Sequence, residues 1–479
     1  MLSIDTIKMI QSGYSLPDNY TTIDIKKATT VNEMFYVTEL KQLIGEKLNK
    51  FYVDTNELRE NYSINAIQKK MNNPLNPYAK ILFAGFTGCG KTTELIKLYE
   101  KVQDKFNIIP FSVISRIRQD NVSIESLLFE IIEDVINLIM INRYFEQPND
   151  DLNTIIENIK KWSVETINVK ENEKTNDKSI SFGLEFLKGI FFSAKNEMNF
   201  TRSEKTISSC IEERKLNDLI FECNKLFDYL KSITGKDTLI IIDDLEKLPF
   251  YNIRDLYIRN STYINMLRAS FILTIPIELV YHPDYALIDN IFGKPEIMYM
   301  IKIRDKDRNP IDDNMKLMKR IIESRIDLNL FEDKCYETAI KYSGGSLREL
   351  FSLINKASEI ENGEKISSKS MEKAVNIYKD FFSNWIYERI DDLKITFDDY
   401  LDILLDIDDG NRENPDLKIA LYDLLRVRAV MKYNGKGYYD VHPLLENFIE
   451  NHRRKRSKKS DKKSQWFDCI YWWRKYIQS

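Results

Sequence analysis

The sequence contains few of the residues that mark several classes of protein. Its 479 residues include five cysteines, three histidines and fifteen glycines. The cysteines are scattered, odd in number and form no C-x-x-C pair, which disfavours a disulfide framework and a zinc site and favours reduced thiols in a cytoplasmic protein. No run of 18 apolar residues occurs, and the N-terminus lacks the charged start and apolar core of a signal peptide. No membrane-spanning segment is therefore predicted.

Charge of one sign is also scarce overall, because the formal net charge is only −4. The distribution is nevertheless uneven. Residues 453–463 carry eight bases and one acid, a net +7, so the rest of the chain carries −11. Apolar residues make up 43% of the chain and aromatic residues 12%. This composition excludes a disordered chain, and the length suffices for about three domains.

Apolar runs and amphipathic patterns alternate along the chain, which predicts an α/β fold with a parallel sheet flanked by helices. After the sheet we expect a helical lid. Helices followed by a strand, an Asn434-Gly435 turn and a second strand then predict a small winged-helix domain. Strands are predicted at 80–84, 107–114, 238–248, 270–279 and 297–303. The predicted regions are 1–78 (helical), 79–305 (α/β core, with a helical insertion at about 135–235), 306–385 (lid), 390–452 (winged helix) and 453–479 (basic and aromatic tail).

One short stretch carries the clearest chemistry. Between an apolar strand and a helix, residues 85–92 fit the pattern G-x-x-x-x-G-K-[ST]. Its glycines let successive backbone N–H groups converge on a phosphate, and the helix start adds its positive end. Lys91 can reach the β- and γ-phosphates, and the Thr92 hydroxyl can ligate Mg²⁺. The predicted nucleotide-binding residues are Gly85, Phe86, Thr87, Gly88, Cys89, Gly90, Lys91, Thr92 and Thr93.

A second stretch supplies carboxylates. The sequence LIIIDDLEKL at 239–248 is an apolar strand that ends in acids. Asp243 is predicted to hold Mg²⁺, and Asp244 to polarise the attacking water, with Glu246 as its competitor. The alternative is an acid cluster that faces solvent. No guanine-reading sequence follows, so ATP is favoured over GTP as the nucleotide.

Together these stretches resemble the AAA+/STAND branch of P-loop ATPases, near bacterial and archaeal ATPases related to origin-recognition proteins. Residues 52–71 resemble the box that shapes an adenine pocket. FILTIPIE at 271–278 resembles a sensor-1 strand, which implies that Thr274 contacts the γ-phosphate or water. YSGGSLRELFSLI at 342–354 resembles a sensor-2 motif, which implies that Arg348 faces the phosphates.

Each sensor assignment has a plainer alternative. Thr274 can be a strand residue satisfied within the sheet. Gly344 and Gly345 can end one helix while Ser346 caps the next, which would leave Arg348 on the surface. The hairpin can likewise be only a hairpin.

The resemblance is incomplete. The sensor strand continues as Thr274-Ile275-Pro276, where many STAND proteins have Thr-Thr-Arg. The arginine that would act on a neighbour's ATP is therefore unassigned. Arg254, Arg259 and Arg268 are candidates, with a solvated helix face as the alternative.

The tail combines the basic run with the aromatic segment 466–477. A basic run can bind nucleic acid or anionic lipid, and the aromatic residues suit a protein interface. The alternative is a solvated linker and a helix that folds back. Residues 182–195 are predicted to form an amphipathic helix that packs on the sheet, with a partner contact as the alternative.

These observations predict a regulatory ATPase that uses ATP and Mg²⁺, turns over slowly without a partner or a homo-oligomer, and couples the nucleotide to its lid and winged helix. One alternative is a DNA-binding initiator or loader. Another is a protein-interaction switch with little hydrolysis, in bacterial defence by analogy of fold.

Overall fold

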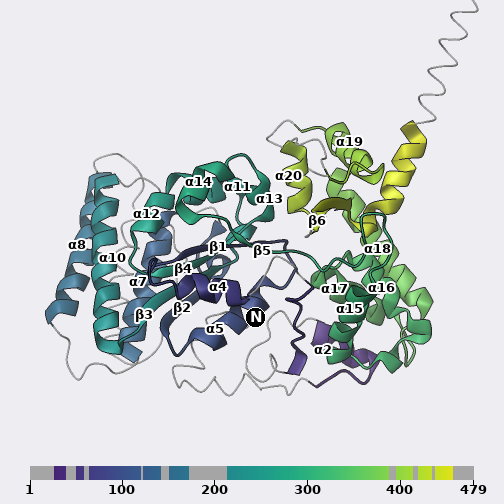
Figure 1. Ribbon diagram of the computed structural model, residues 1–479, viewed down its shortest axis with the longest axis horizontal. Helices are drawn as coiled ribbons and strands as arrows, with labels where there is room; N and C mark the ends of the chain where they lie inside the picture. The colour runs from purple at the N-terminus through teal and green to yellow at the C-terminus, as the bar shows by residue number, and fades with distance from the viewer. Residues whose placement is uncertain are drawn as a thin grey trace, which may run out of the picture. The chain divides into compact units, whose positions relative to one another are not determined.

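The chain divides into two compact units. The computed structural model describes residues 26–38, 50–58, 64–119, 122–141, 150–171, 213–387, 395–413, 419–433 and 437–456 (Figure 1). The first unit comprises Met1–Ile23, Tyr62–Gly85 and Lys91–Ile297, and the second comprises Asp24–Asn61, Phe86–Gly90 and Met298–Ser479.

A five-stranded sheet forms the centre of the first unit. Its strands are β1 (Lys80–Gly85), β2 (Phe106–Ser112), β3 (Asp237–Asp243), β4 (Ser270–Ile275) and β5 (Glu296–Met298), in the order β2-β3-β4-β1-β5. The ladders β1–β4, β2–β3 and β3–β4 are all parallel. Strands β1 and β4 are buried along their whole length, as expected for a parallel sheet that helices cover on both faces. The predicted parallel sheet is confirmed.

Four predicted strands run beyond the real ones: those predicted at 107–114 and 238–248 end at Ser112 and Asp243, and two others also end early. The strand predicted at 270–279 ends at Ile275, because Pro276 has no N–H to continue the ladder and instead precedes helix α13 (Ile277–Tyr281). The strand predicted at 297–303 is only the three-residue β5. Apolar residues beyond it, including Ile301 and Ile303, are buried without extending the strand.

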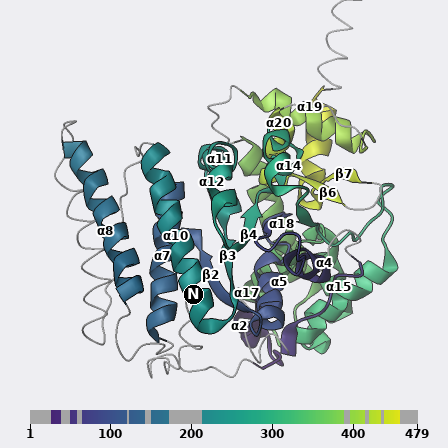
Figure 2. The ribbon, with the colours of Figure 1, turned by 60° about the vertical axis from the view of Figure 1, so that its left-hand side comes forward.

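Three long helices lie side by side next to β2 and β3 (Figures 1 and 2). Helix α10 contacts β3 and both of its neighbours α7 and α8, while α7 contacts β2. They occupy the region predicted as a helical insertion, and the helix predicted at 182–195 lies outside the described residues. The helices of this unit are α4 (Ile64–Met71), α5 (Lys91–Val102), α6 (Val113–Arg116), α7 (Ile124–Ile141), α8 (Asp150–Glu171), α10 (Glu213–Thr234), α11 (Phe250–Arg254), α12 (Ser261–Met266), α13 and α14 (Tyr285–Phe292), with the short turns η3 (Leu245–Lys247) and η4 (Asp255–Arg259).

The second unit begins its helical part after β5. Helix α17 packs on α16 and α18, and also on α2 from the N-terminal region. A buried hydrogen bond from the Thr38 hydroxyl to Asn355 Oδ1 at 3.2 Å joins α2 to α17, and Arg325 Nη1, at the end of α15, donates to the Val37 carbonyl of α2 at 3.2 Å. The elements are η1 (Val31–Glu33), α2 (Met34–Thr38), α15 (Asp312–Arg325), η5 (Leu328–Leu330), η6 (Glu332–Lys334), α16 (Tyr336–Ser343), α17 (Leu347–Ile360) and α18 (Ser368–Tyr387).

The C-terminal domain, residues 395–456, belongs to the same unit. It consists of α19 (Phe397–Asp408), α20 (Ile419–Arg426), the antiparallel hairpin β6 (Val430–Tyr433) and β7 (Tyr438–Val441), the turn η7 (Pro443–Leu445), and a helix over residues 446–456. Two helices followed by a hairpin match the pattern predicted for a winged helix. The Asn434-Gly435 turn itself lies outside the described residues.

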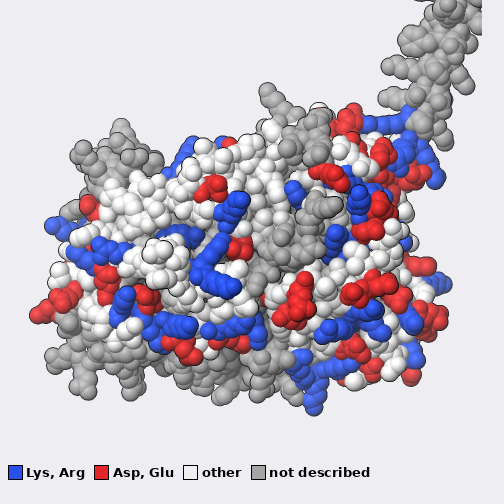
Figure 3. Space-filling view, viewed as in Figure 1, with Lys and Arg blue, Asp and Glu red and all other residues white. Residues whose placement is uncertain are grey.

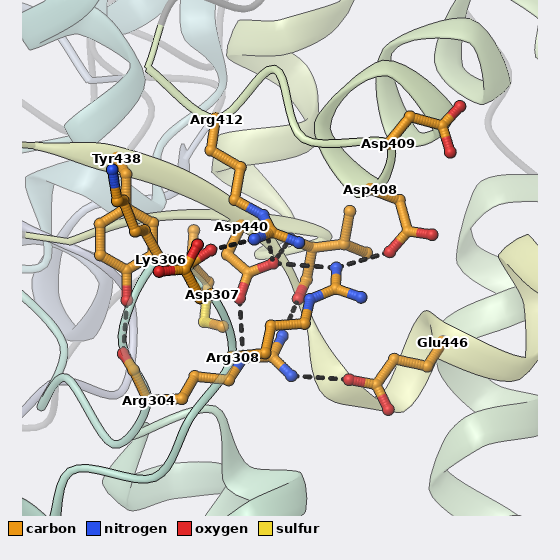
Figure 4. Close-up of polar contacts among 12 residues, drawn as sticks. Arg304, Lys306, Asp307, Arg308, Asp408, Asp409, Arg412, Tyr438, Asp440 and Glu446 are labelled. Carbon is orange, nitrogen blue, oxygen red and sulfur yellow. Dashed lines mark hydrogen bonds and ion pairs between the residues drawn. The ribbon is translucent and has the colours of Figure 1, made fainter.

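A buried cluster of charges holds the segment after β5 against this domain (Figure 4). Arg304 Nε lies 2.7 Å from Asp440 Oδ2, and its Nη1 donates to Glu446 Oε1 at 2.6 Å. Arg308 Nη2 donates to Asp408 at 2.5 Å and to Asp440 at 3.1 Å. The arginine–aspartate cluster consists of Arg304, Arg308, Arg412, Asp408, Asp440 and Glu446. Each of its buried carboxylates is within reach of a guanidinium, which is what makes buried charge tolerable.

Within the described ranges, every helix is too short or too polar to cross a lipid bilayer. Three of the five cysteines, Cys89, Cys223 and Cys335, are described, and all three are buried free thiols.

Candidate functional site

The glycine-rich loop leaves β1 at Gly85 and enters α5 at Lys91. Gly88 and Gly90 have φ values of 90° and 105°, a region that side chains other than glycine rarely adopt. The Cys89 N–H donates to the Phe86 carbonyl at 3.3 Å and closes the turn. The loop thus delivers the N-terminal end of a twelve-residue helix, whose first N–H groups point away from the helix, at the end of a buried strand.

The middle of this loop, Phe86–Gly90, belongs to the second compact unit. A Cβ added to Gly88 would lie 2.7 Å from the Cβ of Arg348, and one added to Gly90 would lie 3.5 Å from Leu347. Glycine is therefore required here for close approach as well as for backbone conformation. The structure brings Arg348, predicted from the sensor-2 motif, next to the loop.

The sheet order brings the other predicted residues to one edge. Because β4 lies between β1 and β3, the carboxyl ends of these strands form a continuous row. In the registers, Thr274 lies opposite Phe83, and Ser112 lies opposite Asp243. Open parallel sheets bind ligands at this edge.

Lysine and threonine from the start of α5 contact the acids at the end of β3. Lys91 Nζ lies 2.9 Å from Glu246 Oε1 and donates to the Gly85 carbonyl at 2.9 Å. The Thr92 hydroxyl donates to Asp243 Oδ2 at 2.6 Å. Lys91, Asp243 and Glu246 are all buried. The predicted phosphate-binding and metal-binding side chains therefore meet, although 151 residues separate Thr92 from Asp243.

The three carboxylates of Asp243, Asp244 and Glu246 crowd together, with one oxygen of each within 4.8 Å of the others. Burial raises the pKa of Asp243, and the charges of Glu246 and Asp244 raise it further. Burial also opposes ionisation of Glu246, but the charge and hydrogen bond of Lys91 outweigh burial and lower the pKa of Glu246. One carboxylate is thus balanced by the lysine while another is poorly balanced, a distribution common in functional sites.

The two candidates for orienting water have different surroundings. Asp244 has a φ of 67°, accepts a hydrogen bond from Ser112 Oγ at 2.6 Å and pairs with Lys247. Glu246 is more deeply buried and pairs with Lys91. The roles of Asp244 and Glu246 as the carboxylate that orients water both stay predictions. Ser112 was not predicted, although its position at the carboxyl end of β2 was a usable signal.

The buried hydroxyl of Thr274 accepts a hydrogen bond from the Leu245 N–H at 3.0 Å, and its carbonyl accepts one from Tyr257 at 2.6 Å. Thr274 therefore holds the turn after β3, as in the plainer alternative, and a contact with a γ-phosphate stays a prediction. Tyr257 is a further residue that the sequence did not indicate.

The sensor-2 motif forms a helix–turn–helix. Gly344, at φ 60°, ends α16, and the side chain of Ser346 accepts a hydrogen bond from the Glu349 N–H to cap α17. This is the predicted helix end and cap. Arg348 is exposed in the first turn of α17.

The other predicted arginines are exposed and paired within the first unit. Arg254 pairs with Asp284 at 2.8 Å, Arg259 with Asp255 at 3.2 Å, and Arg268 with Asp228 at 2.7 Å. None is assigned a role by these contacts. Of the predicted adenine box, residues 59–63 lie outside the described part, and 64–71 form α4, which contacts α5.

The residues present suit a magnesium ion. Mg²⁺ prefers hard oxygen ligands and is usually held by one or two carboxylates or hydroxyls together with substrate phosphates. The Thr92 hydroxyl and the buried Asp243 carboxylate, which is incompletely balanced, provide such oxygens. These two residues are the predicted holders of the ion.

Comparison with known proteins gives structural likeness only. No protein-family model and no curated protein matches the chain. Among solved structures, a Walker-type ATPase of Pyrococcus abyssi has 13% identity and a TM-score of 0.44 over 86% of this chain and 99% of its own. Cdc6p of Pyrobaculum aerophilum has 12% identity and a TM-score of 0.37 over 88% and 98%, and the ORC1 protein of Aeropyrum pernix, solved with DNA, has 10% and 0.37 over 87% and 97%.

The names of these proteins, a Walker-type ATPase, Cdc6p and ORC1, agree with the class that the sequence resembles. Their identities are below 25% and their TM-scores below 0.5, so they say nothing about what this chain binds. The parallel sheet, its strand order and the loop between β1 and α5 establish the P-loop fold on their own.

Proposed function

We propose that this protein binds ATP with Mg²⁺ and hydrolyses it, as a regulatory ATPase. The carrying observation is the contact between the start of α5 and the end of β3, where Thr92 meets Asp243 and Lys91 meets Glu246. A lysine at a helix N-terminus beside a hydroxyl and a carboxylate is the arrangement that P-loop enzymes use for phosphates and magnesium. Lys91 would exchange its contact with Glu246 for the β- and γ-phosphates.

Each residue has a proposed part in the reaction. The loop N–H groups and Lys91 would hold the phosphates, and Thr92 and Asp243 would hold the ion, which when bound would neutralise the negative charge that develops on the departing ADP. Once Lys91 engages the phosphates, Glu246 loses its partner and becomes available to orient the attacking water. Asp244 is the competing candidate, held by Ser112 until it is released.

The proposal includes coupling of nucleotide state to the lid and the C-terminal domain. The charge of that domain favours a switch over a DNA loader. Residues 395–452 contain twelve acidic and six basic side chains, whereas nucleic-acid-binding domains present a basic surface. A domain of net negative charge would repel the phosphate backbone.

The first part of the basic tail is already paired within the domain. Arg453 contacts Asp408 at 2.6 Å and Asp409 at 2.5 Å, and Arg456 contacts Asp402 at 2.6 Å. In Figure 3, acidic side chains (red) and basic side chains (blue) accordingly lie together over the helix at residues 446–456. Lys455, which is exposed, and the bases from Lys458 onward, which lie outside the described residues, remain to be tested as a nucleic-acid contact.

The test is steady-state ATP hydrolysis by the wild type and by Lys91→Ala, with and without duplex DNA, together with the mass of each species in solution. Lysine-dependent turnover that ignores DNA, with a change in assembly on ATP addition, is the expected result. Turnover stimulated by DNA would favour the loader instead. Failure of the wild type to bind Mg²⁺–ATP would overturn the proposal.

A further inference from the structure

The turn that carries Arg348 is fastened to the C-terminal domain. The Tyr433 hydroxyl of β6 donates to the Gly344 carbonyl at 2.7 Å. A Cβ on Gly344 would lie 2.6 Å from the methyl of Met431 and 3.1 Å from Pro443. The turn therefore packs directly against the hairpin and the residues that follow it.

The same turn is held on its other side by the segment after β5. The Ile301 N–H donates to the Gly345 carbonyl at 3.3 Å. A Cβ added to Gly345 would overlap the carbonyl oxygen of Ile301, so no other residue fits there. With both sides occupied, the turn has little room to move independently of its neighbours.

A buried ion pair completes the attachment. Arg428 Nη2 donates to Glu349 Oε1 at 2.9 Å, and both side chains are buried. The other oxygen of Glu349 accepts a hydrogen bond from the Ser346 hydroxyl, which caps α17. Glu349, the residue that follows Arg348, thus connects the helix cap at Ser346 to an arginine between α20 and β6.

The backbone at Arg428 is unusual. Its φ is 64°, a left-handed conformation that is costly for a residue other than glycine. Its guanidinium carbon also lies 5.6 Å from the centre of the Trp385 ring. Burying the pair of Arg428 and Glu349 has a desolvation cost as well. An arginine in a costly backbone conformation that pairs with one buried carboxylate is therefore a specific arrangement.

From these contacts we infer that Glu349 and Arg428 are positioning residues: the C-terminal domain sets where Arg348 lies relative to the glycine loop. The inference rests on the proposed function together with the prediction, from the sensor-2 motif, that Arg348 faces the γ-phosphate. It assigns the C-terminal domain a part in nucleotide discrimination. Conversely, a γ-phosphate that shifts Arg348 would also shift Arg428 through Glu349, and would so bias the position of the C-terminal domain.

The test measures the binding of ATP and of ADP, each with Mg²⁺, to the full chain by calorimetry, and takes the ratio of the two dissociation constants. We expect Arg348→Ala to lower the preference for ATP by about tenfold. Arg428→Ala is expected to lower it in the same direction with ADP affinity retained. The double variant is expected to match Arg348→Ala alone, because Arg428 acts through Arg348.

Two further variants separate positioning from loss of structure. Arg308→Ala removes a different guanidinium of this unit, which contacts Asp408 and Asp440 and none of residues 344–349, and should leave the ratio unchanged. Tyr433→Phe deletes only the hydroxyl bonded to Gly344 and should reduce the ratio less than Arg428→Ala does. If Arg428→Ala does not fold, the ratio measured for Tyr433→Phe tests the inference instead.

An unchanged ratio in Arg428→Ala and Tyr433→Phe, or additive losses in the double variant, would overturn the inference while the proposed function stands. Equal affinities of the wild type for ATP and ADP, both dependent on Lys91, would show that Arg348 does not read the γ-phosphate. That result would also overturn the inference. Absence of any Lys91-dependent nucleotide binding would instead be a failure of the proposed function itself.

Discussion

Two groups of buried charge in this protein are balanced very differently. In the arginine–aspartate cluster, Asp440 has Arg304 and Arg308 beside it. Burial alone would raise the pKa of Asp408, but the hydrogen bonds and charges of Arg453 and Arg308 outweigh burial and lower it. At the end of β3, by contrast, three carboxylates have two lysines beside them, Lys91 at Glu246 and Lys247 at Asp244, and the pKa of Asp243 is raised.

The difference separates a structural role from a functional one. A cluster with a guanidinium for each buried carboxylate is complete as it stands and fastens one segment to another. A site with surplus negative charge is incomplete until cations or donors arrive, and storing such repulsion costs stability. Four predictions test this contrast, beginning with the largest effect.

The first concerns the surplus carboxylates. Glu246→Gln should still bind Mg²⁺–ATP but hydrolyse it about 10²–10⁴-fold more slowly, because the amide cannot accept a proton from water. Asp244→Asn, whose carboxylate is held by Ser112 and Lys247, should lose less. Single-turnover rates with bound ATP decide between them. The reverse order of losses would assign the water-orienting role to Asp244.

The second concerns the balanced cluster. Asp440→Asn should lower the free energy of unfolding by about 3–5 kcal/mol, because it removes the fully buried carboxylate that Arg304 and Arg308 share and leaves Arg304 with the less buried Glu446. Calorimetric unfolding measures the effect. Asp409→Asn is the matched control, since its carboxylate is exposed and pairs with Arg453 at the surface. Equal effects of the two substitutions would show that the cluster is not the stabilising element.

The third prediction concerns Asp243, where the substitution should stabilise the protein rather than destabilise it. Asp243→Asn, measured without Mg²⁺ or nucleotide, should raise the free energy of unfolding by about 0.5–2 kcal/mol. A carboxyl whose pKa is raised on folding costs stability above its ordinary pKa, so the gain should be full at pH 8 and shrink as pH falls toward 4. Destabilisation at pH 8 would remove the distinction between the two groups of charge.

The smallest effect belongs to exposed pairs. Arg456→Ala should change the free energy of unfolding by less than about 1 kcal/mol, because its partners Asp398 and Asp402 are largely exposed. Denaturation at low and high salt checks this value. A loss comparable with that of Asp440→Asn would mean that the helix over residues 446–456 contributes to the cluster more than its contacts indicate.

Sequence patterns predicted the parts of the fold that are local. The strand, loop and helix around Lys91 follow from apolar runs and glycines at fixed spacing, and the parallel sheet follows from the alternation of strands and helices. The end of β4 was misjudged because the apolar run continues through Pro276 into α13, and hydrophobicity alone does not distinguish strand from helix.

Partners distant in sequence could not be predicted. The pattern showed that Lys91 and Asp243 belong to one kind of site, but not that Lys91 would pair with Glu246 or that Ser112 would hold Asp244. Arg304, Arg428 and Asp440 lie in stretches without any motif, because a buried ion pair needs two complementary charges at any separation along the chain. Such pairs are visible only once the chain is folded.

The indole of Trp385 beside the Arg428 guanidinium has a practical consequence. Tryptophan emission responds to charge near the ring, so this residue is an intrinsic optical reporter at the joint between the helical lid and the C-terminal domain. Of the five tryptophans, only Trp162 and Trp385 fall within the described residues. In a background where Trp162, Trp466, Trp472 and Trp473 are replaced by Phe, a shift of emission on adding ATP but not ADP would follow the joint in real time, without attaching any dye.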